Sequence, residues 1–442
     1  MSLVARAAED PHAIAEKLAG EKRFDAAAAV YRDALAESPR DWRLRLGLAR
    51  VTLWAGDYRD AERQFASLLA ERPADANVLL GYAQAAYWSG DFRAAEKRYR
   101  ALAAVQPDHA EAQKVISDLA ALAAPRYEVG AIYRDDSQPF DIGSTQAKVS
   151  WFSDPLTRWD IRGAAGSAAG AASSMSLVGV GVSTGLPRWR MNVDAHAERF
   201  QFPDGQTGTL GGVALTRDLP WKSAIVVSVE RSPLLYTATS VSTHVTATNY
   251  SLAWRRDPSE RWLAAASVTR TEYFDGNDGA GADAWMLAPV YSRGNLTLRA
   301  GASAAWRDTT TERFRFTQFS SREISAGEWA YSFHGVYDPY WTPQDLREGR
   351  LLVVAETPRV KIHLDSGYAE DRAVSFGPST GPSPAPLFIF PVVLDRTFRP
   401  WRAGIEVNFP MTRRIEFRAR YRHDVTTFYR ADEIDASLVG RL

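Results

Sequence analysis

Residues 401–409 read WRAGIEVNF, and apolar and polar side chains alternate along the whole stretch. Successive side chains of a β-strand point to opposite faces, so this pattern predicts a strand with one apolar and one polar face. The same alternation continues from Pro125 to the end of the chain. It is clearest in residues 126–134, 189–198, 295–307, 359–368 and 415–422.

The connections between these strands indicate what kind of sheet they build, because a sheet with one face in water alternates in the same way. Short turns recur at Asp154-Pro155, Leu186-Pro187, Leu219-Pro220, Asp257-Pro258, Arg293-Gly294, Thr357-Pro358 and Pro410-Met411. Longer polar connections lie between them. Four turns are followed closely by tryptophan, at Trp159, Trp189, Trp221 and Trp262. Short turns on one side, long loops on the other and an aromatic belt are typical of an outer-membrane β-barrel.

Seven short turns and two free chain ends delimit eight hairpins, which predicts 16 antiparallel transmembrane strands in residues 126–442. An even number and roughly 10 residues per tilted strand fit a bacterial barrel. The strands are expected near 126–134, 144–153, 157–167, 173–185, 188–200, 207–218, 221–231, 245–256, 261–273, 282–292, 295–307, 347–357, 359–368, 400–409, 413–423 and 429–440.

A barrel of this size encloses an aqueous lumen rather than a packed core. The polar face of the strands is therefore the predicted cargo-binding surface. Its candidate residues are Arg162, Asp194, His196, Glu198, Arg299, Lys361, Asp365, Arg402, Glu406, Arg418 and Arg420. Residues 126–442 hold 36 Lys+Arg and 35 Asp+Glu, so the composition indicates no selectivity for an anionic or a cationic cargo.

Composition excludes several other classes of protein. The 442 residues are 45% hydrophobic and include no cysteine, which rules out disorder, a disulfide framework and cysteine-based zinc sites. The seven histidines are scattered, so we expect neither a metal nor a cofactor. Equal numbers of basic and acidic residues, 53 of each, argue against nucleic-acid binding. No apolar run approaches the roughly 20 residues of a membrane-spanning helix.

The first part of the chain is a repeat. Blocks 8–41, 42–75 and 76–109 align without a gap at a period of 34 residues. Shared columns hold an aromatic residue (Phe24, Tyr58, Phe92), an alanine (Ala27, Ala61, Ala95), a second aromatic (Tyr31, Phe65, Tyr99) and a closing proline (Pro39, Pro73, Pro107). Small alanines let paired helices approach, and proline ends the second helix of each block. The pattern resembles the tetratricopeptide repeat, with a capping helix at 110–123, and predicts a helical solenoid domain over residues 8–123.

A solenoid of this kind usually binds proteins on its concave face, although a rigid spacer is the alternative reading. Trp54, Tyr87 and Trp88 lie near helix ends, and we expect them to fill the core between repeats. Ala5-Arg6-Ala7 has the small-x-small form of a signal-peptidase site, which suggests the remainder of a secretory leader.

Two connections, 308–346 and 370–399, are longer than an idle loop requires. The second is rich in proline and carries the apolar Phe388-Ile389-Phe390. Either both loops gate the mouth of the barrel, with Tyr337, Tyr340 and Trp341 touching cargo, or they pack together as a fixed lid.

Repeats followed by a 16-stranded barrel resemble the outer-membrane exporters of bacterial exopolysaccharides, those of cellulose and of poly-N-acetylglucosamine. Residues 335–344 (GVYDPYWTPQ) look like the aromatic-x-Pro segment that these barrels carry in an extracellular loop. The resemblance implies a porin-like conduit in the Gram-negative outer membrane, embedded in outer-membrane lipid and passed by an exopolysaccharide chain. The repeats would lie in the periplasm and bind synthase or modification proteins of the periplasm or inner membrane.

The chain departs from the cellulose exporters in having only three repeats. An outer-membrane anchor or receptor scaffold with a closed barrel is therefore a second reading. We expect no enzyme, because no G-x-S-x-G, H-E-x-x-H or phosphate-loop motif is present. Asp194 and His196 share a strand face merely because any two residues at i and i+2 do. Carboxylates assembled across strands, from Glu198, Glu406 or Glu416, stay open at this point.

Overall fold

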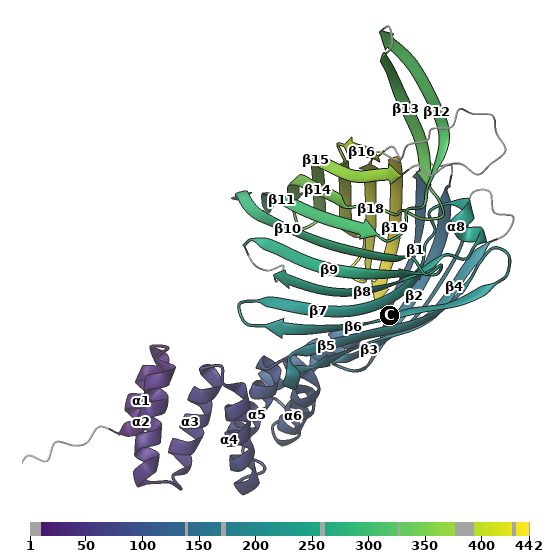
Figure 1. Ribbon diagram of the computed structural model, residues 1–442. Helices are drawn as coiled ribbons and strands as arrows, with labels where there is room; N and C mark the ends of the chain where they lie inside the picture. The colour runs from purple at the N-terminus through teal and green to yellow at the C-terminus, as the bar shows by residue number, and fades with distance from the viewer. Residues whose placement is uncertain are drawn as a thin grey trace, which may run out of the picture. The chain divides into compact units, whose positions relative to one another are not determined.

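The computed structural model describes residues 10–137, 140–168, 174–256, 261–325, 328–375, 393–426 and 430–441. The chain forms two compact units, one helical and one made of β-sheet, which are described separately (Figure 1). The predicted signal-peptidase site at Ala5-Arg6-Ala7 and the segment Phe388-Ile389-Phe390 lie outside the described residues.

Seven helices build the first unit in the described residues. They are α1 (Pro11–Gly20), α2 (Phe24–Glu37), α3 (Trp42–Trp54), α4 (Tyr58–Glu71), α5 (Ala76–Trp88), α6 (Phe92–Val105) and α7 (Ala110–Ala123). Helices α3 to α6 each begin after an aspartate whose carboxylate accepts a hydrogen bond from a backbone N–H of the first turn: Asp41, Asp57, Asp75 and Asp91. The caps satisfy donors that a helix end leaves unpaired, and they fix the residue at which each of these helices begins.

An aromatic ring of each of the first two repeats packs against a glycine of the following repeat. Tyr31 on α2 covers Gly47 on α3, and Phe65 on α4 covers Gly81 on α5, one period later. Both rings are almost fully buried, at 1% and 0% exposed. A side chain at either glycine would overlap the ring, so the close packing of successive repeats depends on its absence.

The expectation for the tryptophans at the helix ends is wrong. Trp54 and Trp88 are 46% and 42% exposed, because each is the last residue of its helix and points past the inter-repeat core. Tyr87 packs within its own repeat, edge to face with Phe92 and Tyr99 of α6.

The second unit is built from long antiparallel strands. Their bounds are β1 (Arg126–Asp136), β2 (Ile142–Asp154), β3 (Thr157–Ala168), β4 (Met175–Leu186), β5 (Met191–Gln201), β6 (Thr207–Leu219), β7 (Ser223–Pro233), β8 (Thr246–Arg256), β9 (Leu263–Tyr273), β10 (Asp278–Arg293), β11 (Leu296–Thr309), β12 (Phe314–Ser325), β13 (Glu328–Tyr337), β14 (Leu346–Glu356), β15 (Val360–Ser375), β16 (Val393–Phe398), β17 (Trp401–Pro410), β18 (Ile415–Val425) and β19 (Arg430–Arg441). A short helix, α8 (Ala238–Ser242), follows β7, and the 3-10 turn η1 (Pro187–Trp189) follows β4.

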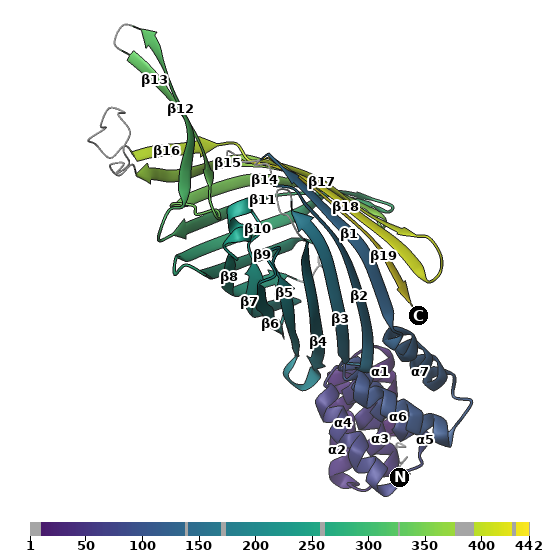
Figure 2. The ribbon, with the colours of Figure 1, turned by 90° about the vertical axis from the view of Figure 1, so that its right-hand side faces the viewer.

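The sheet closes on itself because β1 pairs with β2 on one side and with β19 on the other (Figure 2). Strands β16 and β17 both pair with β15, at residues 369–375 and 360–366, so together they occupy one strand position. In the described part of the chain this gives a closed barrel of 16 strand positions, as the sequence predicts. Six of the seven short turns fall where predicted, and the seventh, Asp257-Pro258, lies outside the described residues.

The structure differs from the prediction in the two long connections. Residues 314–337 form the two-stranded hairpin β12–β13 rather than a loop. Strand β15 runs on to Ser375 and pairs there with β16, so the predicted second loop begins and ends as strand. The missed strands extend beyond the residues predicted for the barrel. They do not enclose the lumen, so their sequence need not alternate between polar and apolar residues.

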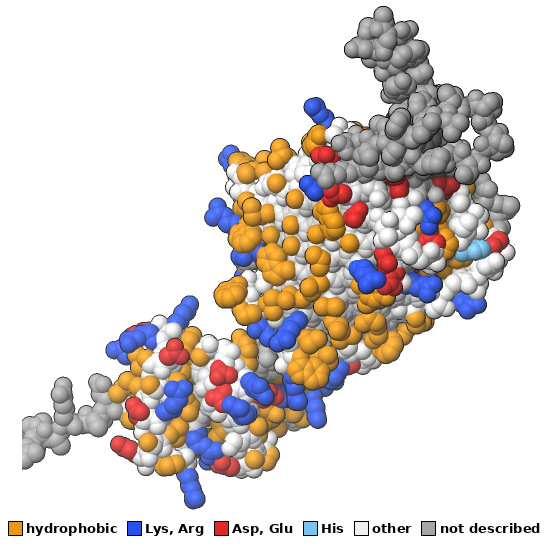
Figure 3. Space-filling view, viewed as in Figure 1, with side chains coloured by type: hydrophobic (Ala, Val, Ile, Leu, Met, Phe, Trp, Pro, Cys, Tyr) orange, Lys and Arg blue, Asp and Glu red, His pale blue; other side chains and the backbone are white. Residues whose placement is uncertain are grey.

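The outside of the barrel is apolar (Figure 3). Exposed aliphatic side chains include Val129, Ile161, Val178, Val213, Leu252, Leu351, Ile362, Leu364 and Ile434. The four tryptophans predicted to mark the short-turn end are exposed, Trp221 by 86%. Further along the strands lies a second exposed aromatic set, Trp306, Tyr368, Trp401 and Tyr421. Trp401 and Phe409 on β17 are separated by about 26 Å of strand, so two aromatic rows border an apolar band. Among the described helices, none is long and apolar enough to cross a membrane.

We expect Gly81→Ala to destabilise the repeats by roughly 1–3 kcal/mol, because the added methyl group forces the Phe65 ring out of its site. The measurement is thermal unfolding of the full chain followed by its helical circular dichroism. Gly20→Ala is the matched control, since nothing lies within 4 Å of a Cβ there. Equal effects of the two substitutions would contradict the packing.

We expect the first repeat to lose stability as the pH rises from 10 toward 12. Burial, reinforced by the Glu16 carboxylate, raises the pKa of Tyr31 from 10.0 to about 12. The folded state therefore keeps the phenol protonated where the unfolded chain ionises, and that stabilisation is complete only below pH 10. Urea unfolding across this range should show a shallower pH dependence for Tyr31→Phe. Parallel curves would refute the assignment.

Candidate functional site

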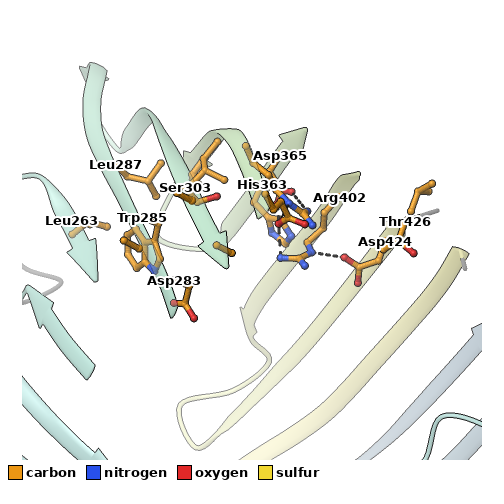
Figure 4. Close-up of a pocket in the computed structure, with 18 of the residues that line it drawn as sticks. Leu263, Asp283, Trp285, Leu287, Ser303, His363, Asp365, Arg402, Asp424 and Thr426 are labelled. Atoms are coloured by element: carbon orange, nitrogen blue, oxygen red, sulfur yellow. Dashed lines mark hydrogen bonds and ion pairs between the residues drawn. The ribbon is translucent and has the colours of Figure 1, made fainter. Parts of the chain in front are cut away.

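The barrel encloses a cavity of about 850 Å³ on the polar face of the strands. Its lining comes from β9, β10, β11, β14, β15, β16, β17 and β18, together with Trp341 from the connection before β14 and Thr426 after β18. Figure 4 shows these side chains converging from several strands on one space. The cavity contains five of the predicted cargo-binding residues: Arg299, Trp341, Lys361, Asp365 and Arg402.

Acidic and basic side chains alternate along one wall of the barrel, in a set that we call the charge ladder. Each member contacts the next across strands β14, β15, β17, β18 and β19: Glu348, Arg350, Asp365, Arg402, Asp424, Arg422, Glu433, Arg420 and Asp435. Nε of Arg350 lies 2.6 Å from Oε1 of Glu348, and its Nη1 lies 2.6 Å from Oδ1 of Asp365. Figure 4 shows Asp365 and Asp424 on either side of Arg402. Each charged side chain of the ladder thus lies next to a side chain of opposite charge, which offsets the cost of removing it from water.

Ion pairs on β3, β5 and β7 skip a strand. Nη1 of Arg162 on β3 lies 3.2 Å from Oε1 of Glu198 on β5, across β4. Nε2 of His196 on β5 lies 3.1 Å from Oε1 of Glu230 on β7, across β6. Gly212 on β6 makes the second contact possible, because a Cβ there would collide with the Glu230 carboxylate.

Four further predicted lumen residues are also paired with neighbouring side chains: Arg299, Lys361, Glu406 and Arg418. Arg299 contacts Glu356 across β11 and β14. Nζ of Lys361 lies 3.9 Å from Oε1 of Glu406. Arg418 contacts Glu416 two positions earlier on β18, at 3.0 Å. Asp194 lies on β5, on the same strand face as His196 and Glu198, opposite Ala214 of β6. The sequence therefore placed these residues on the correct face.

Two tryptophans add aromatic surface to the cavity. Trp285 on β10 points into it beside Leu263 and Leu287 (Figure 4). Trp341 enters from the connection, with the guanidinium of Arg307 5.8 Å from its ring centroid. The cavity therefore combines flat aromatic faces with charged and hydrogen-bonding groups.

The segment that carries Trp341 is fixed in place. Tyr340 is fully buried, stacks on Tyr273 at 4.1 Å between ring centroids, and donates a hydrogen bond to Asp275. Tyr337 is 4% exposed and its hydroxyl donates to Asp371 at 2.9 Å. The prediction that Tyr337 and Tyr340 touch cargo is therefore corrected: burial leaves only Trp341 of the three on the cavity, and the two tyrosines hold it there.

A second connection is tied to the same segment. The hydroxyl groups of Thr237 and Thr239, at the start of α8, donate to the carboxylate of Asp338 at 2.9 and 3.0 Å. Val241 of α8 also joins an apolar cluster with Phe140, Phe200 and Phe202 from neighbouring connections. These contacts fasten α8 to the segment that carries Trp341. The choice between a gate and a fixed lid also depends on residues 376–392, which lie outside the described residues.

Several lumen residues were missed from the sequence. Glu348 and Arg350 precede the run Leu351–Val354, whose unbroken apolar character hides the alternation of β14. Asp424 lies one residue beyond the predicted end of its strand, and Trp285 was not among the predicted lumen residues. The sequence pattern that could have identified them is the i+2 spacing of charged residues, which places Glu348 with Arg350, and Arg422 with Asp424, on one strand face.

Among the described residues, no group of three or more His, Asp or Glu side chains is arranged to hold a metal ion.

The fold and site define a class: an outer-membrane type β-barrel with a polar lumen, joined to helical repeats. The tetratricopeptide repeat family matches residues 18–69 and 52–119. No curated protein sequence matches the chain.

Three solved structures are similar to the chain to different degrees. A bacterial polysaccharide outer membrane secretin is 10% identical, with a TM-score of 0.51 over 72% of this chain and 99% of its own. CdiB from Acinetobacter baumannii is 6% identical, with a TM-score of 0.41 over 72% of this chain and 60% of its own. The translocator domain of the autotransporter NalP from Neisseria meningitidis is 12% identical, with a TM-score of 0.25 over 76% and 96%. At 10% identity, the likeness to the secretin extends to the fold alone.

We expect Tyr340→Phe to loosen the segment that holds Trp341. The hydroxyl donates to a carboxylate and accepts from Asn277, and its loss costs roughly 1–3 kcal/mol of local stability. Trypsin cleavage after Arg347, followed by mass spectrometry, should become faster. Tyr236→Phe, a 40% exposed tyrosine, is the control. Equal cleavage rates in the two variants would show that the hydroxyl does not anchor the segment.

Proposed function

We propose that the protein is an outer-membrane conduit through which an exopolysaccharide chain leaves the cell. The observation that carries the proposal is the cavity of about 850 Å³ inside a closed barrel, lined by both paired charges and tryptophan faces. Sugar rings stack on aromatic faces, and their hydroxyl groups exchange hydrogen bonds with arginine and carboxylate side chains. The shared fold with the polysaccharide secretin supports the proposal.

The contacts suit transit better than retention. The charged side chains of the charge ladder already have protein partners, so a passing chain exchanges hydrogen bonds with them without finding a deep site. A conduit needs many weak contacts, because one tight site would stall the chain. The process requires no catalytic step.

The repeats would act in the periplasm as a docking platform for the synthase or modification proteins that deliver the chain. Three repeats form a continuous surface, and Trp54 and Trp88 lie exposed on it one period apart. Exposed tryptophan side chains are common anchors of protein interfaces.

We expect soluble cello- or N-acetylglucosamine oligomers to block ion conductance of the purified protein in planar bilayers. Trp285→Ala should raise the blocking concentration roughly 2- to 10-fold, since an aromatic contact contributes about 0.5–1.5 kcal/mol. Trp221→Ala is the matched control, because that side chain lies on the outer surface and is 86% exposed.

A closed barrel that binds no sugar would defeat export and favour the anchor or receptor reading. The observation that favours the anchor or receptor reading is the packing of connections around Asp338. The conduit would be supported if sugars block conductance of the wild type, and if that block is weaker in Trp285→Ala but not in Trp221→Ala.

A further inference from the structure

Strand β10 runs past the start of its neighbour β9 at the short-turn end of the barrel, and we call the resulting gap the notch. The two strands lie side by side (Figure 1), and their last pair is Leu263 with Leu287. Strand β10 continues to Arg293, and in the described residues no strand pairs with it there on the β9 side. Pro289, which has no N–H to donate, stands in this stretch.

The outer side of the notch holds a hollow of about 450 Å³, which we call the outer hollow. It is lined by Arg261, Trp262, Met286, Ala288 and Pro289. Leu263 and Leu287 line the lumen cavity, so their neighbours Trp262 and Met286 point to the outside. Both are accessible there, at 38% and 54% exposed. The outer hollow is therefore apolar except for one arginine.

A second hollow, of about 410 Å³, lies on the inner side of the notch. Its lining includes the hydroxyl groups of Ser292 and Thr297 and also Arg299, which lines the lumen cavity as well. Arg261 and Pro289 line both hollows, so the two adjoin at Arg261. Both volumes are in the range of about 300–1,000 Å³ that is typical of small-molecule sites. An apolar space and a polar space thus meet at one positive charge.

The charge of Arg261 is not neutralised within the described residues. Neither hollow includes an acidic residue in its described lining, and no described carboxylate contacts Arg261. Arg299 differs, because it is paired with Glu356. Asp257 and Glu260 of the preceding turn lie outside the described residues. This arrangement favours a ligand that carries a negative charge.

The depth of the notch indicates the kind of ligand. Trp262 belongs to the aromatic row at one border of the apolar band, which is the level at which lipid headgroups meet hydrocarbon. The guanidinium of Arg256 lies 3.8 Å from the centroid of the Trp262 ring and supports the ring at that level. A ligand that reaches this place from the membrane has an apolar chain and a polar head, and arginine is suited to bind a phosphate.

We propose that the notch binds one anionic glycerophospholipid, such as a phosphatidylglycerol. One acyl chain lies in the outer hollow on Trp262 and Met286, and the phosphate binds Arg261. The hydroxyl groups of the head then reach Ser292 and Thr297 in the inner hollow. The proposal concerns the wall of the barrel, so it holds whether or not the lumen exports a polymer.

The first test measures the binding of four probes to the purified full chain in a non-ionic detergent by native mass spectrometry. The probes are phosphatidylglycerol, phosphatidylethanolamine with the same acyl chains, the corresponding diacylglycerol, and glycerol 3-phosphate. We expect phosphatidylglycerol to bind about fivefold or more tightly than phosphatidylethanolamine, because it keeps a net negative charge beside Arg261. The other two probes, which lack either the phosphate or the chains, should bind more weakly still.

Two results of this comparison would overturn the proposal. Equal binding of phosphatidylglycerol and phosphatidylethanolamine would show that the net charge is not recognised. Equal binding of phosphatidylglycerol and glycerol 3-phosphate would show a site for a free anion that does not use the apolar hollow.

The second test locates the site on the chain. Arg261→Gln should lower the affinity for phosphatidylglycerol about fivefold and change that for phosphatidylethanolamine little. Arg413→Gln is the matched control, because it removes the same charge from an exposed position in another short turn. Ala288→Phe fills the outer hollow and should weaken the binding of both lipids. Circular dichroism of the β-sheet shows whether each variant is folded.

Three outcomes of the second test count against the proposal. Equal effects of Arg261→Gln and Arg413→Gln would show that the lipid responds only to the general charge of the short-turn end. Unchanged binding in folded Ala288→Phe would place the acyl chain elsewhere. A dimer of the wild type that Ala288→Phe dissociates would assign the outer hollow to a second copy of the chain.

Discussion

The pairing of β1 with β19 is the interaction on which the barrel depends. A sheet that faces an apolar phase has no water to satisfy its edge groups, so every strand needs two neighbours and the sheet must close. Closure with 16 strand positions fixes a wide interior, which side chains cannot fill. It also fixes which face of each strand looks inward, and thereby commits every second residue to one of two environments.

The charge ladder follows from that commitment. Arginine and carboxylate side chains cannot lie on the apolar outer surface, so they gather inside, on neighbouring strands held about 4.7–4.9 Å apart. Pairing along the ladder then neutralises them one by one, from Glu348 on β14 to Asp435 on β19. Gly212 shows the same constraint at another wall, where the absence of a side chain lets His196 and Glu230 meet across a strand. The interior stays polar without a strong field.

The helical unit is stabilised by a different device. Its repeats are joined by an aromatic ring on glycine, once per period, and by aspartate caps that begin the helices. Such a stack leaves its helix ends open, which is why Trp54 and Trp88 are exposed and not buried as their apolar character suggests. Two units with separate sources of stability can be joined by the two residues between Ala123 and Arg126.

The sequence by itself determined the repeats, the number of barrel strands and the side chains that face the lumen, because periods of 34 and 2 are local properties of the chain. It did not determine which inward residues meet. Asp365 and Arg402 lie on strands separated by a long connection, and only the register of β15 on β17 places them opposite one another. Nor could it place Tyr337 and Tyr340, since their burial depends on contacts with Asp371 of β15 and with Asp275 of the turn between β9 and β10. Local periodicity sets the face of each residue, and strand register and loop packing decide its neighbours.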